Sequence, residues 1–234
     1  MFKKKLVYLA CLPVLAVAGE NGGVLETNYG AGIAYSESRN SKGLRASGNV
    51  SIPVYKYIGS TLFVNGSKTE GEKNSLDSDA YRVGGVAFLR DFNLGKLGVS
   101  AAYNKTNFDT PSGSSLDDTE LNQYGLLGQY YFNDFTFGAN RNVVDSKDFD
   151  DFNSWTASID WYWQENTKLS LDGSGMDAKD SYGIRVSHQP NFFNNSTDIT
   201  FSYNGYRTDD VFSLSVNYYF GTLVTLQDRD RKYR

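Results

Sequence analysis

The sequence predicts an all-β protein, a single antiparallel up-and-down transmembrane β-barrel of about twelve strands, within a range of roughly ten to fourteen. Apolar side chains recur at every second position along most of the chain, which is the period of a strand with one apolar face. Short turns alternate with longer polar connections, and aromatic residues, 15% of the 234, gather at both ends of the apolar faces. A charged fraction of 21% and a mean hydropathy of -0.46 exclude a bundle of membrane-spanning helices.

The N-terminus has the features of a cleaved signal peptide. Lysines at positions 3–5 precede an apolar stretch over residues 6–18, which is shorter than the about 20 residues that a membrane-spanning helix needs. Residues 16–18 read Ala-Val-Ala, a small-x-small pattern that predicts cleavage before Gly19. The alternative, a lipoprotein signal ending at Cys11, leaves a very short apolar core. An exported chain without disulfides is typical of a bacterial envelope.

The alternation of apolar and polar residues sets the expected strands and the organisation of the chain. The first run starts at Leu25, and the runs that follow cover residues 44–54, 58–67, 80–90, 97–106, 122–132, 135–142, 153–163, 168–173, 182–189 and 198–206. The last and most regular run has these apolar members: Phe212, Leu214, Val216, Tyr218 and Phe220. We therefore expect a signal peptide (1–18), a barrel (19–220) and a C-terminal tail (221–234).

A soluble β-sandwich would also alternate, but two features favour a membrane barrel. Short turns at 133–134 and 164–167 are interleaved with longer polar stretches at 68–79 and 107–120, as in outer-membrane barrels with short periplasmic turns and long outer loops. Amphipathic rings favour the two bilayer interfaces, whereas a sandwich core has no reason to sort them. The aromatic group expected at the short-turn end is Tyr130, Phe132, Phe135, Trp161, Trp163, Tyr218 and Phe220. The group expected at the loop end is Tyr35, Tyr81, Tyr103, Trp155, Tyr182 and Phe212.

With these features the mature chain resembles Gram-negative outer-membrane β-barrel proteins of the porin-like kind. The strand over residues 211–220, with its closing aromatic Phe220, resembles the assembly signal that the barrel-assembly machinery reads. The resemblance implies the cell outer membrane as location and its lipid and lipopolysaccharide as partners. It implies no cofactor and no nucleic acid, and it leaves the oligomeric state open. The chain departs from the pattern because residues 221–234 follow Phe220.

Signatures of an enzyme are missing from the mature chain. Nucleophilic catalysis needs a base beside a Ser, Cys or Thr, and the single histidine, His188, lacks the serine spacing of barrel lipases. By parity His188 shares the lipid face of Ile184 and Val186. The acidic residues within 145–151 are more typical of a solvated loop than of a divalent-ion site. We therefore expect no enzyme activity and no metal.

Seven charged residues have the parity of the inward face. Those expected toward the loop end are Arg45, Arg82 and Arg185; those expected near the short-turn end are Glu26, Asp160 and Asp198, with Asp172 between. Charges inside a barrel are tolerated only if they are hydrated or paired. They therefore indicate either a constriction in a narrow passive pore for small polar solutes, which we prefer, or a salt-bridge network that fills a closed barrel. A closed structural or surface-interaction barrel would act through acidic outer loops that bind partners or lipopolysaccharide, with bridging divalent cations.

Two further expectations concern specific groups. The register of the turns predicts that Asp160 faces Asp172 and that Asp172 faces Arg185, whose cation would hold the two carboxylates together. The tail is basic, with Arg229, Arg231, Lys232 and Arg234 against two aspartates. It is expected to be a periplasmic segment that either docks near the lower rim or is an idle extension.

Overall fold

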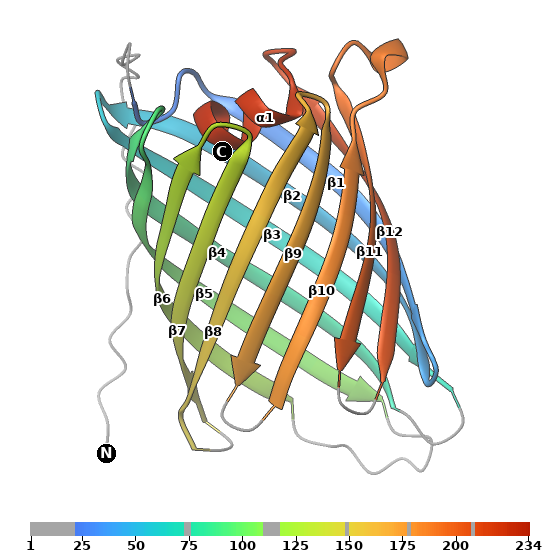
Figure 1. The fold of residues 1–234 in the computed structure, drawn as a ribbon. Coiled ribbons are helices and arrows are strands. Elements are labelled where there is room, and N and C mark those ends of the chain that lie inside the picture. Colours follow the sequence, from blue (N-terminus) through green and yellow to red (C-terminus); the bar gives the residue numbers. More distant parts are fainter. Residues whose placement is uncertain (1–21, 73–75, 110–117, 148–149, 177–178, 207–208) are drawn as a thin grey trace, which may run out of the picture.

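The computed structural model describes residues 22–72, 76–109, 118–147, 150–176, 179–206 and 209–234. They form a closed barrel of twelve antiparallel strands, so the predicted fold class and strand number are confirmed. Each strand pairs with its neighbours in sequence, and β1 pairs with β12 to close the barrel (Figure 1). The strands are β1 (Asn28–Ser38), β2 (Ser41–Tyr55), β3 (Ile58–Gly71), β4 (Asp77–Asp91), β5 (Gly95–Asp109), β6 (Thr119–Phe132), β7 (Phe135–Ser146), β8 (Phe152–Gln164), β9 (Thr167–Met176), β10 (Lys179–His188), β11 (Thr197–Tyr206) and β12 (Asp210–Phe220).

The barrel has two ends, which we name by their connections. The turn end carries the connections 56–57, 92–94, 133–134, 165–166 and 189–196. The loop end carries the others, and the predicted loops 68–79 and 107–120 are shorter there than expected. Polar residues at this end continue the strand ladders, as where Lys68 lies opposite Asp79, because backbone pairing does not require apolar side chains. The predicted signal peptide, residues 1–18, lies outside the described residues.

The outer face of the barrel is apolar over its middle. Ile33, Leu126 and Phe201 are 62%, 62% and 53% exposed, respectively. In water this would be an unusually large exposed apolar surface. In a bilayer it is favourable, because a closed barrel leaves no backbone group unpaired in the hydrocarbon. We therefore treat the barrel as membrane-spanning. Among the described residues, no helix is both long and apolar enough to cross a membrane.

Aromatic side chains lie on the outer face at both ends of this apolar surface. At the turn end the ring of Trp161 stacks on those of Phe135 and Trp163, with centroids 6.2 and 6.3 Å apart. At the loop end the rings of Tyr203 and Phe212 are 5.1 Å apart. Other predicted members of the two groups are exposed as well: Tyr130, Phe132, Tyr35 and Trp155. That these rings mark the bilayer interfaces remains a prediction.

Strand β12 closes the barrel against β1, where Phe220 lies opposite Tyr29. The apolar residues of the predicted assembly signal are all exposed: Phe212, Leu214, Val216, Tyr218 and Phe220. Alternate residues of β12, such as Tyr219, are turned toward the lumen. The recognition of this strand during assembly stays a prediction.

The chain does not end at the rim of the barrel. At Gly221, with a φ of +115°, it turns back, and the helical part of the tail, residues 226–234, lies inside the turn end (Figure 1). This tail contains the short helix α1 (Leu226–Asp228) and a π-helical turn, η2 (Arg229–Tyr233). Its backbone is bound to the rest of the chain, since Gln227 N donates to Glu165 O at 3.0 Å. The sequence predicts a segment beyond the barrel, either docked near the lower rim or idle, whereas the structure places Leu226 and Arg234 in the lumen.

Candidate functional site

The lumen contains a polar cavity of about 640 Å³. Small hydroxyl side chains keep this space open, among them Ser170, Ser187, Thr200, Ser213 and Ser215. The charged groups that line it are Arg45, Lys168, Asp172, Arg185, Asp198 and Arg234. Arg234 and Leu226 belong to the tail, so the tail forms part of the cavity wall.

The predicted ion pair between Asp172 and Arg185 is present, with Arg185 Nη2 2.9 Å from Asp172 Oδ1. The predicted register is wrong by two residues, since Asp172 lies opposite Gly183 and Arg185 opposite Ser170. The arginine therefore reaches Asp172 diagonally. Gly183 leaves room for this, because a Cβ there would lie 2.5 Å from Asp172 Oδ2.

Asp160 does not face Asp172, contrary to the prediction. It lies opposite Ser170 on β9 and Thr136 on β7. The strand register shifts between Tyr162 and Gln164, so counting residues from the turn gives the wrong partner. The two carboxylates are therefore not direct neighbours, and Arg185 is not needed to hold them together.

The other predicted lumen residues differ in their surroundings. Arg45 lines the cavity. Arg82 is half-buried, donates to Gln123 Oε1 at 3.0 Å and lies 5.2 Å from the ring of Phe63. Glu26 is exposed and precedes β1, so its position facing the lumen stays a prediction. The chain before β1 has left the ladder there and is bound to the tail.

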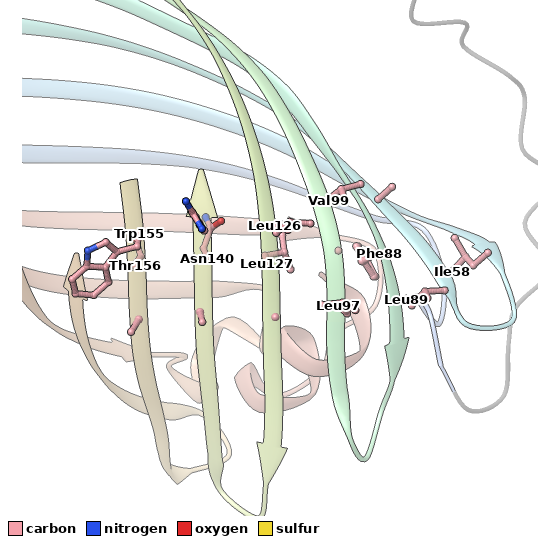
Figure 2. A pocket seen from close by; sticks show the side chains of 16 residues that line it. Ile58, Phe88, Leu89, Leu97, Val99, Leu126, Leu127, Asn140, Trp155 and Thr156 are labelled. Atoms are coloured by element: carbon pink, nitrogen blue, oxygen red, sulfur yellow. The ribbon is translucent and has the colours of Figure 1, made fainter. Parts of the chain in front are cut away.

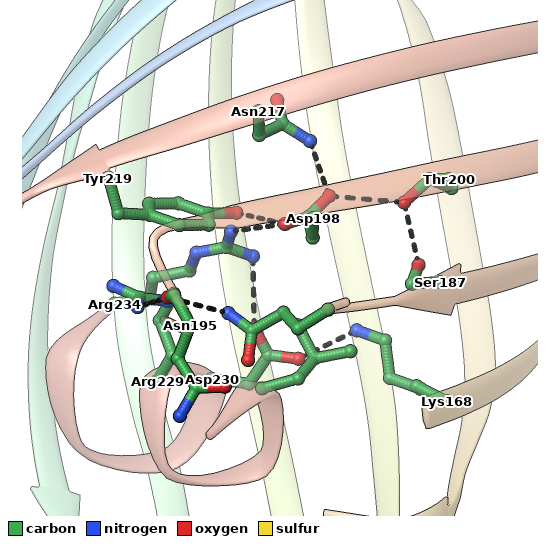
Figure 3. A network of polar contacts seen from close by, with 12 residues as sticks. Lys168, Ser187, Asn195, Asp198, Thr200, Asn217, Tyr219, Arg229, Asp230 and Arg234 are labelled. Atoms are coloured by element: carbon green, nitrogen blue, oxygen red, sulfur yellow. Dashed lines mark hydrogen bonds and ion pairs between the residues drawn. The ribbon is translucent and has the colours of Figure 1, made fainter. Parts of the chain in front are cut away.

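Asp198 on β11 is the centre of a buried network at the turn end (Figure 3). Its side chain is 3% exposed. Asn217 Nδ2 donates to Oδ1 at 2.8 Å, the Tyr219 hydroxyl donates to Oδ2, and Arg234 Nη2 lies 3.5 Å from Oδ2. The sequence placed Asp198 near this end but could not supply its cation, because Arg234 comes from the tail.

Asp230 of the tail is a second centre of the same network. Its Oδ2 accepts from Lys168 Nζ at 2.7 Å and from the Tyr162 hydroxyl at 2.9 Å. Its Oδ1 accepts from Arg234 Nη1 at 2.9 Å. The Lys168 and Asp230 side chains are each 14% exposed, so this ion pair is largely removed from water. One tail carboxylate is thereby attached to both β8 and β9.

Three tail arginines, Arg229, Arg231 and Arg234, lie against aromatic rings of the lumen wall. The Arg229 guanidinium is 3.8 Å from the centroid of Tyr219, and Nη2 donates to Asn195 O at 2.8 Å. Burial lowers the pKa of Arg229 to about 10, which leaves it charged at neutral pH. Arg231 donates from Nη2 to Phe135 O at 2.7 Å. Cation–π contacts of this kind stabilise a buried guanidinium that has no carboxylate partner.

The outer face carries an apolar hollow of about 860 Å³, whose side chains include Leu97, Val99 and Leu126 (Figure 2). Arg141 on β7 borders it and is exposed on this face. Arg141 lies opposite Trp155 and Leu126 in the sheet. The alternation along β7 marks Arg141 as outward, so Arg141 is not among the charged residues predicted for the inward face.

The loop end is acidic, and three of its lysines are in ion pairs. Lys42 Nζ lies 2.7 Å from Glu72 Oε1, and Lys105 Nζ lies 2.8 Å from Asp118 Oδ2. Lys147 pairs with Glu120. No group of three or more metal-ligating side chains occurs within the described part of the chain. His188 is exposed on the outer face and bonded at Nδ1 to Thr167 Oγ1 at 2.9 Å.

Comparison with known proteins bears on the fold. No family model matches the chain, and no curated protein sequence matches it. The structure is similar to the KdgM porin in complex with disordered oligogalacturonate, with a TM-score of 0.58 and 9% identity over 82% of this chain and 99% of that one. It is also similar to the translocator domain of the autotransporter NalP from Neisseria meningitidis, with a TM-score of 0.56 and 12% identity over 88% and 91% of the two chains. The fold is that of porin-like outer-membrane barrels.

Proposed function

We propose that this protein is a narrow passive pore for small polar solutes in a Gram-negative outer membrane. The observation that carries the proposal is a polar cavity of about 640 Å³ within a barrel whose outer face is apolar. A lumen filled for structural reasons alone has no need of open space lined by hydroxyls and amides. Barrels of about eight strands fill their interior with side chains, and larger ones enclose channels.

The charges of the cavity support a polar solute. Arg45 and Arg185 face it from β2 and β10, and the Asp172 and Asp198 carboxylates each have a cationic partner. The KdgM porin is described in complex with oligogalacturonate, so a barrel of this fold can admit a polar chain. The similar structures named above are a porin and a translocator domain, which supports a role without catalysis.

Conductance in planar lipid bilayers tests the proposal. Purified protein, with the predicted N-terminus at Gly19, is expected to give stepwise current with an ohmic voltage dependence. N-terminal sequencing of protein from membranes checks the cleavage site, and a chain beginning at Cys11 or a lipid there would contradict it. Absence of current at any voltage, from the correctly inserted protein and from its tail-deleted variant alike, would remove the pore proposal.

A second function is favoured by one observation, the tail within the turn end. A barrel closed there would be a structural or surface-interaction protein whose acidic loop end binds partners or lipopolysaccharide. Such a protein would insert and show heat-modifiable migration on gels, but would not conduct even without its tail. The two functions therefore differ in the conductance of a tail-deleted variant.

A further inference from the structure

We propose that residues 221–234 are a displaceable plug that gates the pore from the turn end. The proposal rests on the proposed pore function and adds its regulation. Leu226 and Arg234 line the lumen cavity, so the tail forms its boundary toward the turn end. Displacement of the tail would extend the cavity to that end.

The attachments of the plug extend across the lumen wall. Arg231 is bound to Phe135 at the start of β7, Asp230 to β8 and β9, and Arg234 to Asp198 of β11. On the side of β1, Leu25 N donates to Lys232 O at 3.0 Å. A segment fixed at these points crosses the turn end instead of lying along one wall.

The plug is held by contacts that differ in kind from those of the barrel. The strands are joined by continuous backbone ladders, whereas the plug is held chiefly by ion pairs, side-chain hydrogen bonds and cation–π contacts. Its buried apolar side chains are Leu226 and Tyr233. Units with few apolar contacts open at lower free energy than the core of a fold. The plug can therefore detach while the barrel stays folded.

Gly221 supplies the pivot between β12 and the plug. Its φ of +115° is a conformation that residues with a Cβ rarely adopt. A Cβ at position 221 would meet no steric clash, since its nearest neighbour would be Thr27 O at 3.8 Å. Glycine is therefore required by the positive φ of the chain reversal.

The charge of the plug gives its movement a direction. Its four basic and two acidic side chains have a net charge of +2. A potential that is positive at the turn end pushes this charge into the barrel, and the opposite polarity draws it out. Channel opening is therefore expected to be more frequent at one polarity, and the asymmetry should vanish when the plug is removed.

Two isosteric substitutions two residues apart provide a matched test in planar bilayers. Asp230→Asn removes the charge that binds Lys168 and Arg234, so the channel should be open several-fold more of the time. Asp228→Asn is the control, because Asp228 pairs with Lys232 inside the plug, at 2.7 Å, and its carboxylate has no ion pair with a strand among the residues that the structure describes. An equal open fraction for Asp230→Asn and wild type would overturn the plug.

A disulfide between plug and wall makes the test reversible. The 3.0 Å hydrogen bond from Gln227 N to Glu165 O brings the two backbones close enough for Glu165→Cys with Gln227→Cys. The oxidised channel should stay closed and open after reduction, whereas a channel indifferent to reduction would overturn the plug. Deletion of residues 222–234 separates the two proposals. If deletion and wild type conduct equally, the pore stands and the plug fails; if neither conducts, both fail.

Discussion

Ion pairs at the two ends of the barrel use the same residue types in different surroundings. At the turn end Lys168 and Asp230 are each 14% exposed, whereas at the loop end Lys42 and Glu72 are 46% and 45% exposed. Charged pairs in water contribute about 0–1 kcal/mol, because solvent screens them. Withdrawn from water, an unpaired charge is costly, so each partner depends on the other. The ion pair at the turn end is therefore shielded from water, whereas the ion pair at the loop end is solvated.

The largest effect expected from this difference is on unfolding. Asp198→Ala removes a buried carboxylate, so the Tyr219 hydroxyl loses its acceptor, while Arg234 retains Asp230 as a partner. We expect the free energy of unfolding to fall by about 1–3 kcal/mol, the cost of leaving a buried polar group without its hydrogen-bond partner. Denaturant unfolding in lipid vesicles measures it.

The control at the loop end is Glu72→Ala, which removes the exposed partner of Lys42 and should cost no more than about 1 kcal/mol. Equal losses for the two variants would show that the turn-end network is as solvated as the loop end. The contrast between the ends would then fail.

Aromatic stacking predicts a smaller difference between the ends. Trp161 stacks on two rings at the turn end, and Tyr103 is paired with Tyr81 at the loop end, with centroids 5.9 Å apart. Since such a pair contributes about 0.5–1.5 kcal/mol, Trp161→Ala should lose roughly twice as much pairing energy as Tyr103→Ala. The same unfolding measurement compares them, and a larger loss for Tyr103→Ala would contradict the stack.

Much of the barrel follows from the sequence because one face of every strand meets lipid. The outward run Phe212 to Phe220 and the inward position of Arg185 depend only on a period of two, which lipid on one side enforces. These features depend on residues that are close in sequence and on the lipid that surrounds every strand.

What could not be predicted depends on groups that are distant in sequence or on local irregularity. Asp198 was placed in the lumen, but its partner Arg234 reaches it only because the tail folds back at Gly221. Asp160 lies opposite Ser170, two residues from the predicted Asp172, and the register shift between Tyr162 and Gln164 accounts for one of these two residues. Neither a reversal of the chain nor a bulge changes the alternation of apolar and polar residues in a way that the sequence reveals.

Breaking the ion pair between Arg185 and Asp172 should change ion selectivity while changing stability little. Arg185→Ala leaves the Asp172 carboxylate facing the cavity without its cation, so selectivity should move toward cations. Because the Arg185 side chain is 45% exposed, the unfolding free energy should change by no more than about 1 kcal/mol. Reversal potentials in a salt gradient measure the shift. Lys105→Ala, on the outer face of the loop end, is the control, and a shift as large in that variant would remove the lumen assignment.

The smallest expected effect locates the membrane relative to the loop end. Arg141 is exposed on the outer face opposite Trp155. An arginine facing lipid costs about 2–4 kcal/mol at the bilayer midplane and about 0–1 kcal/mol near the interfaces. Since aromatic rings favour the interfaces, Trp155 places Arg141 near the outer one, and Arg141→Leu should stabilise the barrel by no more than about 1 kcal/mol. Arg45→Leu is the matched inward change, which should alter conductance while Arg141→Leu does not. A gain of several kcal/mol in vesicles would instead put Arg141 near the midplane, and the apolar span would then reach further toward the loop end than the aromatic group indicates.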